Sequence, residues 1–435
     1  MRLELGSFPV RDIVFSNRTR WHDGVLEVDA RALLEEVRAD SRITVAELEL
    51  ARPGESIRIW PVRDAIEPRV KVEGPGVAYP GICGRPIDTV GQGRTHRLAG
   101  MSLVEVSEVL PHDAGGDYNS IFYDMSGPWA DAIPMSKLLN LCFLVEADSS
   151  LTVLDQNDAV HRATLLLADK LAATTVGLEP PEREVFELKP VDPALPRVVY
   201  MPCLHSAQAM SGNATNAFFC TTTTYGLSQL SAPWILHPNE VLDGAITGPY
   251  RIASSWHMAN NPILLELYRR HGIDLNFLGV IAIRTEWTTM HEKELMCLQT
   301  AKIAKMMGAQ GAIVAWDAGG NEFLEVIHTV RACEREGVKA VLLTTEDDPT
   351  GDAPTLLEPL PEADAVVSVF IPGTPLPGMA PVDGVPMLPP VERVIGSPTR
   401  LTGPVRDEVI ASGGPLLPPR YNDTYGFGRL SGVEY

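Results

Sequence analysis

The first hundred residues alternate between apolar and polar positions in several short runs, the pattern of half-buried strands. Residues 21–28 place an Asp-Gly pair before such a run and predict a hairpin. Residues 56–62 alternate in the same way, whereas residues 30–37 repeat their apolar positions at helical spacing. We therefore expect a β-rich N-terminal domain, residues 1–105, that contains one short helix.

Mixed helix and strand signals follow. A helix is expected from near Asn157 to Ala173, with Asn157 as its N-cap. Residues 176–196 are rich in Pro and Glu, which is typical of a linker, and a new strand begins at Arg197. The pattern indicates an α/β region, residues 106–196, with the linker at its end.

The most regular pattern lies in the second half of the chain. Apolar runs that predict buried strands alternate with helical repeats, each helix being followed by a glycine: strands at 277–283, 311–316 and 339–344, helices at 292–307 and 322–336. Such alternation predicts an α/β domain, residues 197–370, with a parallel Rossmann-like sheet. Ligands of such sheets bind beyond the carboxyl ends of the strands, which directs attention to residues 284–286 and 317–321.

The C-terminal segment has a different composition. Twelve of the 36 prolines fall between residues 372 and 419, too many for helices or central strands. We expect residues 371–435 to form an extended, proline-rich arm that wraps its own domain or a partner.

Composition and charge narrow the function classes. The chain is 45% hydrophobic and 21% charged, as in ordinary globular proteins, and its net charge is 36 − 56 = −20. Without a basic block, binding to nucleic acid or to anionic membranes is not expected. The N-terminus carries charges where a signal peptide needs an apolar run, and residues 138–145 are too few to span a bilayer. We expect a cytoplasmic protein whose six cysteines are thiols.

Two clusters of polar residues are candidates for chemistry. Residues 91–96 predict a turn that presents Arg94 and His96 to a carboxylate, since the run lacks the remaining features of a phosphate loop. Ligand types that zinc or iron accepts occur further on, although their spacing fits no closed structural site: Cys203, His205, Cys220 and His257. The alternative is that these four are core thiols and hydrogen-bonded histidines.

Several blocks resemble one known family. In order along the chain, the similar blocks are residues 51–56, 67–74, 88–96, 124–128, 237–246, 260–262, 270–277 and 426–431. They resemble the α-type substrate-binding subunit of the glycine, sarcosine, betaine and proline reductases. The resemblance implies an oxidoreductase subunit in a hetero-oligomer that binds a small amine or carboxylate substrate. A partner subunit with a reactive cysteine or selenocysteine would then cleave a C–N bond, or another bond to carbon, reductively.

The resemblance also implies a cofactor that this sequence does not readily provide. Precursors in the family cut themselves before a cysteine that follows the block at 237–246, and this cysteine becomes a pyruvoyl group. Here residues 247–261 contain no cysteine, and the segment is shorter than in the family. Ser254 or Ser255 could take its part, because a hydroxyl can replace a thiol in such chemistry. The alternatives are a chain without any cofactor and serines that only hydrogen-bond the local backbone.

The hypothesis of an enzyme subunit gives roles to further residues. The substrate would be surrounded by Arg94, His96, Asp124, Ser126, Asn260 and Asn261, with Ser254 and Ser255 at the catalytic position. Glu240 or Asp243 would act as acid or base if burial raised its pKa. Two other hypotheses stay open: a non-catalytic assembly paralogue, and an enzyme that uses a metal in a rebuilt pocket.

Overall fold

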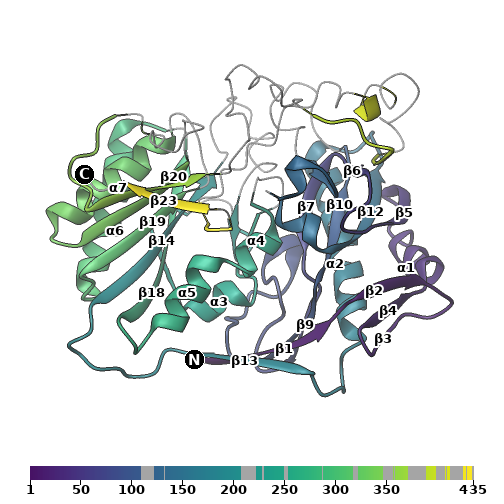
Figure 1. The fold of residues 1–435 in the computed structure, drawn as a ribbon, viewed down its shortest axis with the longest axis horizontal. Coiled ribbons are helices and arrows are strands. Elements are labelled where there is room, and N and C mark those ends of the chain that lie inside the picture. The colour runs from purple at the N-terminus through teal and green to yellow at the C-terminus, as the bar shows by residue number, and fades with distance from the viewer. Residues whose placement is uncertain are drawn as a thin grey trace.

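The computed structural model shows two lobes side by side (Figure 1). It describes residues 1–108, 122–131, 133–206, 222–227, 230–248, 253–286, 288–316, 322–345, 356, 358–370, 388–397, 407, 409–411, 425–427 and 429–433. One lobe is rich in β-structure, and the other is built on a seven-stranded sheet with helices. Both are α/β in the broad sense of the sequence-based prediction.

The described residues of the β-rich lobe form four sheets. The first has the order β13 (Glu182–Glu187), β1 (Arg2–Pro9), β9 (Gly93–Ala99), β8 (Arg69–Glu73), and the second the order β5 (Ile43–Ala51), β12 (Leu139–Ala147), β10 (Met101–Val106), β7 (Val62–Ile66). Two three-stranded sheets complete the lobe: β2 (Asp12–Phe15), β4 (Val25–Val28), β3 (Arg20–His22), and β11 (Tyr123–Asp124), β6 (Ile57–Ile59), β22 (Arg393–Ile395). Strands from both sides of residue 105 therefore share sheets, while the predicted domain boundaries themselves stay a prediction.

Helices and short turns cover this lobe. Helix α1 (Ala30–Val37) has the predicted bounds, and the predicted hairpin at residues 21–28 is β3 and β4. Helix α2 (Val153–Ala173) packs on β12 and contributes Leu167 and Leu171 to the core. The 3-10 turns among the described residues of this lobe are η1 (Ile82–Gly84), η3 (Pro128–Asp131) and η4 (Pro134–Lys137).

The predicted N-cap in residues 106–196 is wrong, and the predicted linker includes a strand that was not expected. The N-cap of α2 is Thr152, whose Oγ1 accepts a hydrogen bond from the Asp155 N–H, and Asn157 lies inside the helix with its Nδ2 donating to the Val153 carbonyl. The predicted linker at 176–196 contains the edge strand β13. Its first four residues are exposed and mostly charged, so the strand lacks the apolar alternation that would reveal it.

The second lobe is organised by a sheet of order β16 (Trp234–Leu236), β18 (Asn276–Glu286), β14 (Arg197–Ser206), β19 (Gly311–Trp316), β20 (Lys339–Thr345), β21 (Ala365–Phe370), β23 (Arg429–Val433). The five central strands are parallel and the two edge strands are antiparallel. The predicted parallel arrangement thus holds for the core of the sheet. Strand β18 lies beside β14 on one side, and the next strand in the chain, β19, lies beside β14 on the other side.

Helices cover both faces of this sheet (Figure 1). Helices α6 (Met290–Met306) and α7 (Phe323–Arg335) pack on one face with an apolar core. The other face is covered by α3 (Pro238–Leu242), α4 (Ser255–Ala259) and α5 (Pro262–Arg270), near the small ladder of β15 (Thr223–Thr224) and β17 (Ile246–Thr247). Among the described residues, no helix has both the length and the apolar character that a membrane crossing requires.

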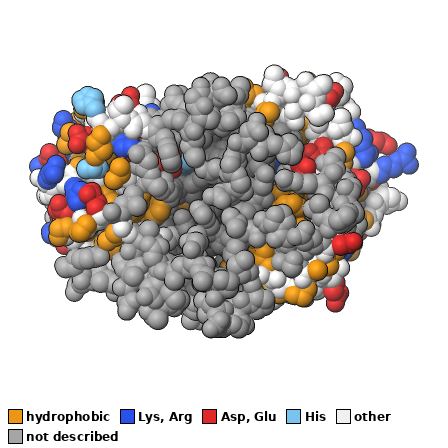
Figure 2. Space-filling model, turned by 90° about the horizontal axis from the view of Figure 1, so that it is seen from above, with side chains coloured by type: hydrophobic (Ala, Val, Ile, Leu, Met, Phe, Trp, Pro, Cys, Tyr) orange, Lys and Arg blue, Asp and Glu red, His pale blue; other side chains and the backbone are white. Residues whose placement is uncertain are grey.

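The described parts of the C-terminal segment contact both lobes. Strand β22 pairs with β6 in the β-rich lobe, and β23 pairs with β21 in the other. Most of the predicted proline-rich arm lies outside the described residues. On the face seen in Figure 2, the described Lys and Arg side chains lie among Asp and Glu at both ends of the molecule.

A buried ion pair fixes one of these contacts. Arg58 donates to both carboxylate oxygens of Asp124, at 2.6 and 2.8 Å, and also to the Val409 and Pro389 carbonyls. Both side chains are fully buried. Burial raises the pKa of Asp124, and the Arg58 guanidinium opposes this.

We expect Asp124→Ala to destabilise the fold by about 3–5 kcal/mol, because it leaves the Arg58 charge buried without its partner. Urea unfolding followed by circular dichroism measures the change. The matched control is Asp131→Ala, which removes an exposed carboxylate from the neighbouring turn and should leave the midpoint in place. Equal midpoints for the two variants would show that the Arg58–Asp124 ion pair does not make this contribution to stability.

Candidate active site

A pair of buried serines stands where α4 begins, directly after residues 249–252, which lie outside the described residues. Ser254 is the N-cap of α4, and Ser255 is its first residue. Each side chain is about 1% exposed. Both hydroxyls have specific side-chain partners, so they do more than bond the local backbone.

Ser254 is held by a histidine of the same short helix. Its Oγ lies 2.8 Å from Nδ1 of His257, and its backbone N–H donates to the same nitrogen at 3.0 Å. The Tyr123 hydroxyl is a further hydrogen-bond partner of Ser254. Burial lowers the pKa of His257 to about 3, so its imidazole is neutral at physiological pH.

Ser255 is held by a carboxylate from the other lobe. Asp64 on β7 accepts the Ser255 hydroxyl at Oδ2 over 2.6 Å and the Ser255 backbone N–H at Oδ1 over 2.8 Å. The Gly248 N–H donates to the same Oγ at 3.2 Å. Burial raises the pKa of Asp64 to about 6, against the favourable charge of nearby His161. A carboxyl group with this pKa can take up and release a proton near neutral pH.

A buried ion pair lies behind Asp64. His161 Nδ1 is 2.9 Å from Oε2 of Glu105, which also accepts the Thr164 hydroxyl at 2.7 Å. Burial lowers the pKa of His161, but the Glu105 charge outweighs this and the net shift is upward. The pKa of Glu105 is held below its usual value because His161 outweighs the cost of burial. This upward shift favours the protonated form of His161, which has Glu105 as its counter-ion and interacts electrostatically with Asp64.

A second buried carboxylate, Asp243, joins the lobes at the end of α3. It accepts the Thr95 hydroxyl at 2.6 Å and the Gly91 N–H at 2.7 Å, and it forms an ion pair with the Lys71 ammonium. Gly91 has φ 95°, and a Cβ there would meet the Glu240 nitrogen at 2.8 Å. All three partners belong to the β-rich lobe, so Asp243 joins the second lobe to it through hydrogen bonds and an ion pair.

Neighbouring polar groups extend this interface. Glu240 accepts the Tyr225 hydroxyl at 2.5 Å and the His237 N–H at 2.6 Å, which completes a capping box for α3. Arg69, fully buried, donates to the Glu67 carboxylate and, over 3.1 Å, to Oδ1 of Asn260. Glu240 and Asn260 are therefore hydrogen-bonded parts of the interface.

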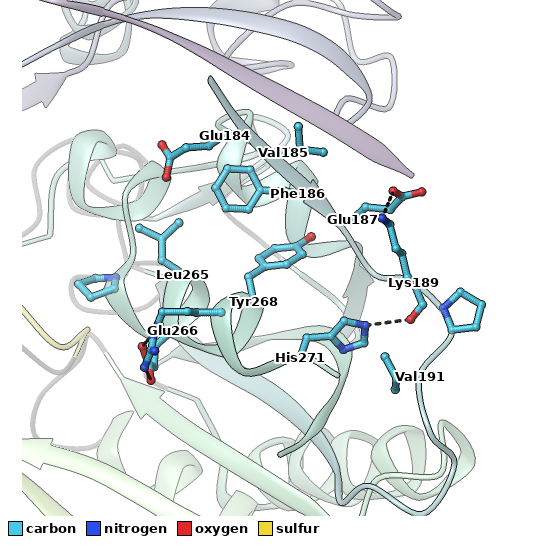
Figure 3. Close-up of a pocket in the computed structure, with 13 residues that line it drawn as sticks. Glu184, Val185, Phe186, Glu187, Lys189, Val191, Leu265, Glu266, Tyr268 and His271 are labelled. Atoms are coloured by element: carbon cyan, nitrogen blue, oxygen red, sulfur yellow. Dashed lines mark hydrogen bonds and ion pairs between the residues drawn. The ribbon is translucent and has the colours of Figure 1, made fainter. Parts of the chain in front are cut away.

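A groove of about 970 Å³ lies between β13 and α5 (Figure 3). Phe186 and Tyr268 line it together with Leu265 and His271. The Tyr268 hydroxyl donates to Asn239, whose Nδ2 donates to the Gly91 carbonyl at 3.0 Å. Hydrogen bonds through Asn239 and Gly91 therefore connect Tyr268 in the groove to Asp243, and Ser254 and Ser255 do not line the groove.

Comparison with known proteins identifies the family. The model of the glycine/sarcosine/betaine reductase component B subunits matches residues 1–411. The chain belongs to this family. It is 34% identical over 381 residues to the sarcosine reductase complex component B subunit alpha of Peptoclostridium acidaminophilum, with 85% of each chain covered. No solved structure matches the chain.

Relatives named for other substrates are equally similar. Identity is 33% over 408 residues to the glycine reductase complex component B subunits alpha and beta of Acetoanaerobium sticklandii, which covers 91% of this chain and 89% of the relative. Identity is 35% over 355 residues to the betaine reductase complex component B subunit alpha of Peptoclostridium acidaminophilum, which covers 80% of this chain and 78% of the relative. The resemblance inferred from sequence blocks is confirmed, and the component B subunits are parts of larger complexes.

The predicted substrate residues do not all lie together. Arg94 and His96 lie on strand β9 rather than in a turn: Arg94 pairs with Glu4 at 2.6 Å, and His96 is buried with Nδ1 3.1 Å from the Thr175 carbonyl. Burial lowers the pKa of His96. Their role in substrate binding stays a prediction.

Three other predicted substrate residues lie at separate positions in the fold. Asp124 is engaged by Arg58, and Ser126 is half-buried just after β11. Asn261 is the N-cap of α5, with its Oδ1 accepting the Leu264 N–H and its Nδ2 donating to the Tyr200 hydroxyl. These contacts are compatible with structural roles, and substrate contact stays a prediction for all three.

The suggested metal ligands do not gather in the described part of the chain. No group of three or more His, Cys, Asp or Glu side chains there could hold a metal ion. Cys203 is fully buried in the apolar core against α6 and α7, and His205 lies 2.6 Å from Glu322. His257 serves Ser254 instead, and Cys220 lies outside the described residues. The five described cysteines form no disulfide.

Sequence reasoning missed Asp64 and Tyr123 and assigned His257 to a different role. A signal for Asp64 was present, because Arg63 and Asp64 interrupt the apolar strand β7 with two charges that are both buried. Charged residues are almost never fully buried unless they are paired, so such an interruption indicates a partner elsewhere. The partner is 191 positions away, and the sequence does not name it.

The raised pKa of Asp64 predicts how stability depends on pH. Its ordinary value is 3.8 and its value in the fold is about 6, so the folded state holds the proton more tightly than the unfolded state. The contribution is complete below about pH 4 and is lost as pH rises through about 6. Two pKa units correspond to about 3 kcal/mol. Between pH 4 and 7 the wild type should therefore lose up to about 3 kcal/mol relative to Asp64→Asn. Urea unfolding at each pH measures this difference, and parallel pH curves would contradict it.

Proposed function

We propose that this chain is the substrate-binding subunit of a reductase complex that cleaves a bond between carbon and nitrogen, or another leaving group, in a small amine or carboxylate. A partner subunit would supply the attacking thiol or selenol, and with it the electrons. One observation supports the proposal: the Asp64–Ser255 and Ser254–His257 pairs lie in the segment after the block at residues 237–246, the segment in which the family resemblance implies the reactive group.

The residues of this site suit the binding of a small polar molecule away from water. Asp64 can hold or release a proton at Oδ2, and neutral His257 holds the Ser254 hydroxyl in place. The nearby charge of His161 favours the ionised form of Asp64. The Asp243 cluster holds the lobes together so that β7 and α4 keep their relative position.

The pyruvoyl group implied by the resemblance can be compared with the residues present. A carbonyl precursor needs a side-chain nucleophile beside a proton acceptor, and Ser255 beside Asp64 meets this requirement. Asp64, His257 and the Gly248 N–H would surround such a group. A ketone there would withdraw electrons from an attached amine and weaken its bond to the α-carbon.

Substrate binding by the purified chain tests the proposal. Titration calorimetry with glycine, sarcosine and betaine should give a saturable signal with at least one of them. That signal should be lost in His257→Ala and kept in Asp131→Ala. A chain that binds none of the three, in a complex that releases amine without it, would favour the assembly paralogue instead.

A further inference from the structure

We propose that helix α6 is a self-association surface, on which a second copy of this chain docks antiparallel across a twofold axis at Leu298. The helix lies on the side of the second lobe that is remote from the β-rich lobe, and on the face of the seven-stranded sheet opposite α4 (Figure 1). The inference therefore concerns a surface away from Ser254 and Ser255, and it goes beyond the proposed function.

Helix α6 carries apolar side chains on two faces. One face is buried against β18 and α7 and includes Met296, Cys297 and Ala301. A helix that covers a sheet normally turns polar side chains to the solvent on its other face. Here four of the fourteen exposed large hydrophobic side chains among the described residues lie on that outer side of one helix: Met290, Leu295, Leu298 and Met306. Exposed apolar side chains that gather in this way mark an interaction surface.

The exposed face is organised as a row of residues spaced four apart. All five members of the row are exposed, and in chain order they are Met290, Glu294, Leu298, Lys302 and Met306. Side chains four apart are neighbours on a helix surface, so the row forms one continuous ridge. Its chemistry reads apolar, acidic, apolar, basic, apolar.

This order of residue types is complementary to its own reversal. A twofold axis at Leu298 places the two copies of that side chain together and sets Glu294 of each chain opposite Lys302 of the other. Met290 faces Met306 of the other copy at both ends of the ridge. Apolar groups thus meet apolar groups, and each acid meets a base, twice in the dimer. Such an isologous contact closes after two subunits.

The charges of the ridge select the antiparallel arrangement. A parallel pair of α6 helices would place Glu294 against Glu294 and Lys302 against Lys302, and like charges that face each other across an interface are unfavourable. Within the described part of the chain, neither of these two side chains has an ion-pair partner, whereas the neighbouring Lys305 pairs with Glu336. Both charges are therefore available to a second copy.

The packing of two such ridges has a known geometry. Rows of residues four apart pack into each other's grooves with the helix axes about 8–10 Å apart. At this separation, the two copies of residue 298 at the axis come within reach of a disulfide bond. An interface built mainly on one helix from each copy belongs to the small, weak class, so we expect a dissociation constant of about 1–100 µM.

Sedimentation velocity of the full chain tests the self-association. We expect a dimer fraction that rises over about 1–100 µM protein. Glu294→Lys and Lys302→Glu should each weaken the dimer by about tenfold, because each change turns both ion pairs into like-charge pairs. An equimolar mixture of the two variants should dimerise again, since the basic ridge of one then faces the acidic ridge of the other. The double variant Glu294→Lys/Lys302→Glu keeps both charges in one chain and is the matched control, with the wild-type affinity expected.

A cysteine at the axis tests the position of the contact. Leu298→Cys should form a disulfide-linked dimer on oxidation. Met290→Cys should not, because its two copies would lie about 24 Å apart along the helices. The wild-type chain under the same conditions gives the background from its six native cysteines. Circular dichroism shows whether each variant folds.

Three results would overturn the inference: a chain that stays monomeric over the whole concentration range, a dimer that the charge variants leave unchanged, or equal cross-linking of Leu298→Cys and Met290→Cys. A monomeric chain whose α6 variants fail to join the reductase complex would assign this surface to another subunit. Amine release tests the proposed function separately, and Glu294→Lys should leave it unchanged because α6 lies away from the serines of α4.

Discussion

Replacing Ser255 with Ala should lower amine release by the assembled complex by about 10³-fold, the loss expected when a reacting side chain and its proton partner are separated. The hydroxyl is the group that Asp64 and the Gly248 N–H both address, and Ala leaves them without it. Amine release is measured with the chain, its partner subunit and a dithiol reductant, at saturating substrate.

Ser102→Ala is the matched control for this prediction. Ser102 is also a fully buried serine, and its hydroxyl donates to Oδ1 of Asn140 at 2.6 Å, within the second sheet of the β-rich lobe. Its replacement should cost about 1 kcal/mol of stability and leave turnover within about threefold. Equal turnover in Ser255→Ala and Ser102→Ala would remove Ser255 from the reaction.

Replacing Asp243 with Ala should destabilise the protein by about 3–5 kcal/mol. The change leaves the Lys71 ammonium, whose side chain is 4% exposed, without its counter-ion, and it also deprives Thr95 and the Gly91 N–H of their acceptor. Urea unfolding measures the loss. Asp274→Ala, at an exposed carboxylate that pairs with Arg270, should leave the midpoint unchanged.

A double variant separates the ion pair from the rest of this cluster. If the unpaired Lys71 charge causes most of the loss, Lys71→Met in the Asp243→Ala background should recover a large part of it. No recovery would assign the loss to Thr95 and the Gly91 backbone instead.

The sequence predicted helices and strands correctly where the apolar positions repeat at one regular spacing. Helix α1 and the alternating strands and helices from β18 to β20 were predicted because their apolar positions repeat regularly. Strand β13 was missed because its exposed, charged residues hide the period of two. The start of α2 was misplaced because Thr152 and Asn157 are both good cap residues, and only the backbone shows which one takes that position.

The candidate site was predictable only in part. Ser254, Ser255, Glu240 and Asp243 could be named as candidates because they lie in or shortly after the block at residues 237–246 that resembles the family. Asp64 and Lys71 were not, because their importance lies in contacts over 191 and 172 positions that no local pattern encodes. His257 was recognised as chemically capable but assigned to a metal, since the spacing in the sequence cannot show that its ring turns back on Ser254.

The most direct test of the proposed function is an omission experiment. The reductase complex is reconstituted from the subunits of its own cell with glycine, sarcosine or betaine, with this chain present, absent or replaced by Ser255→Ala. The proposal predicts amine release only with the wild-type chain, and from at least one of the three substrates. Equal release in its absence, or release that does not depend on Ser255, would contradict a reaction centre at the junction of β7 and α4.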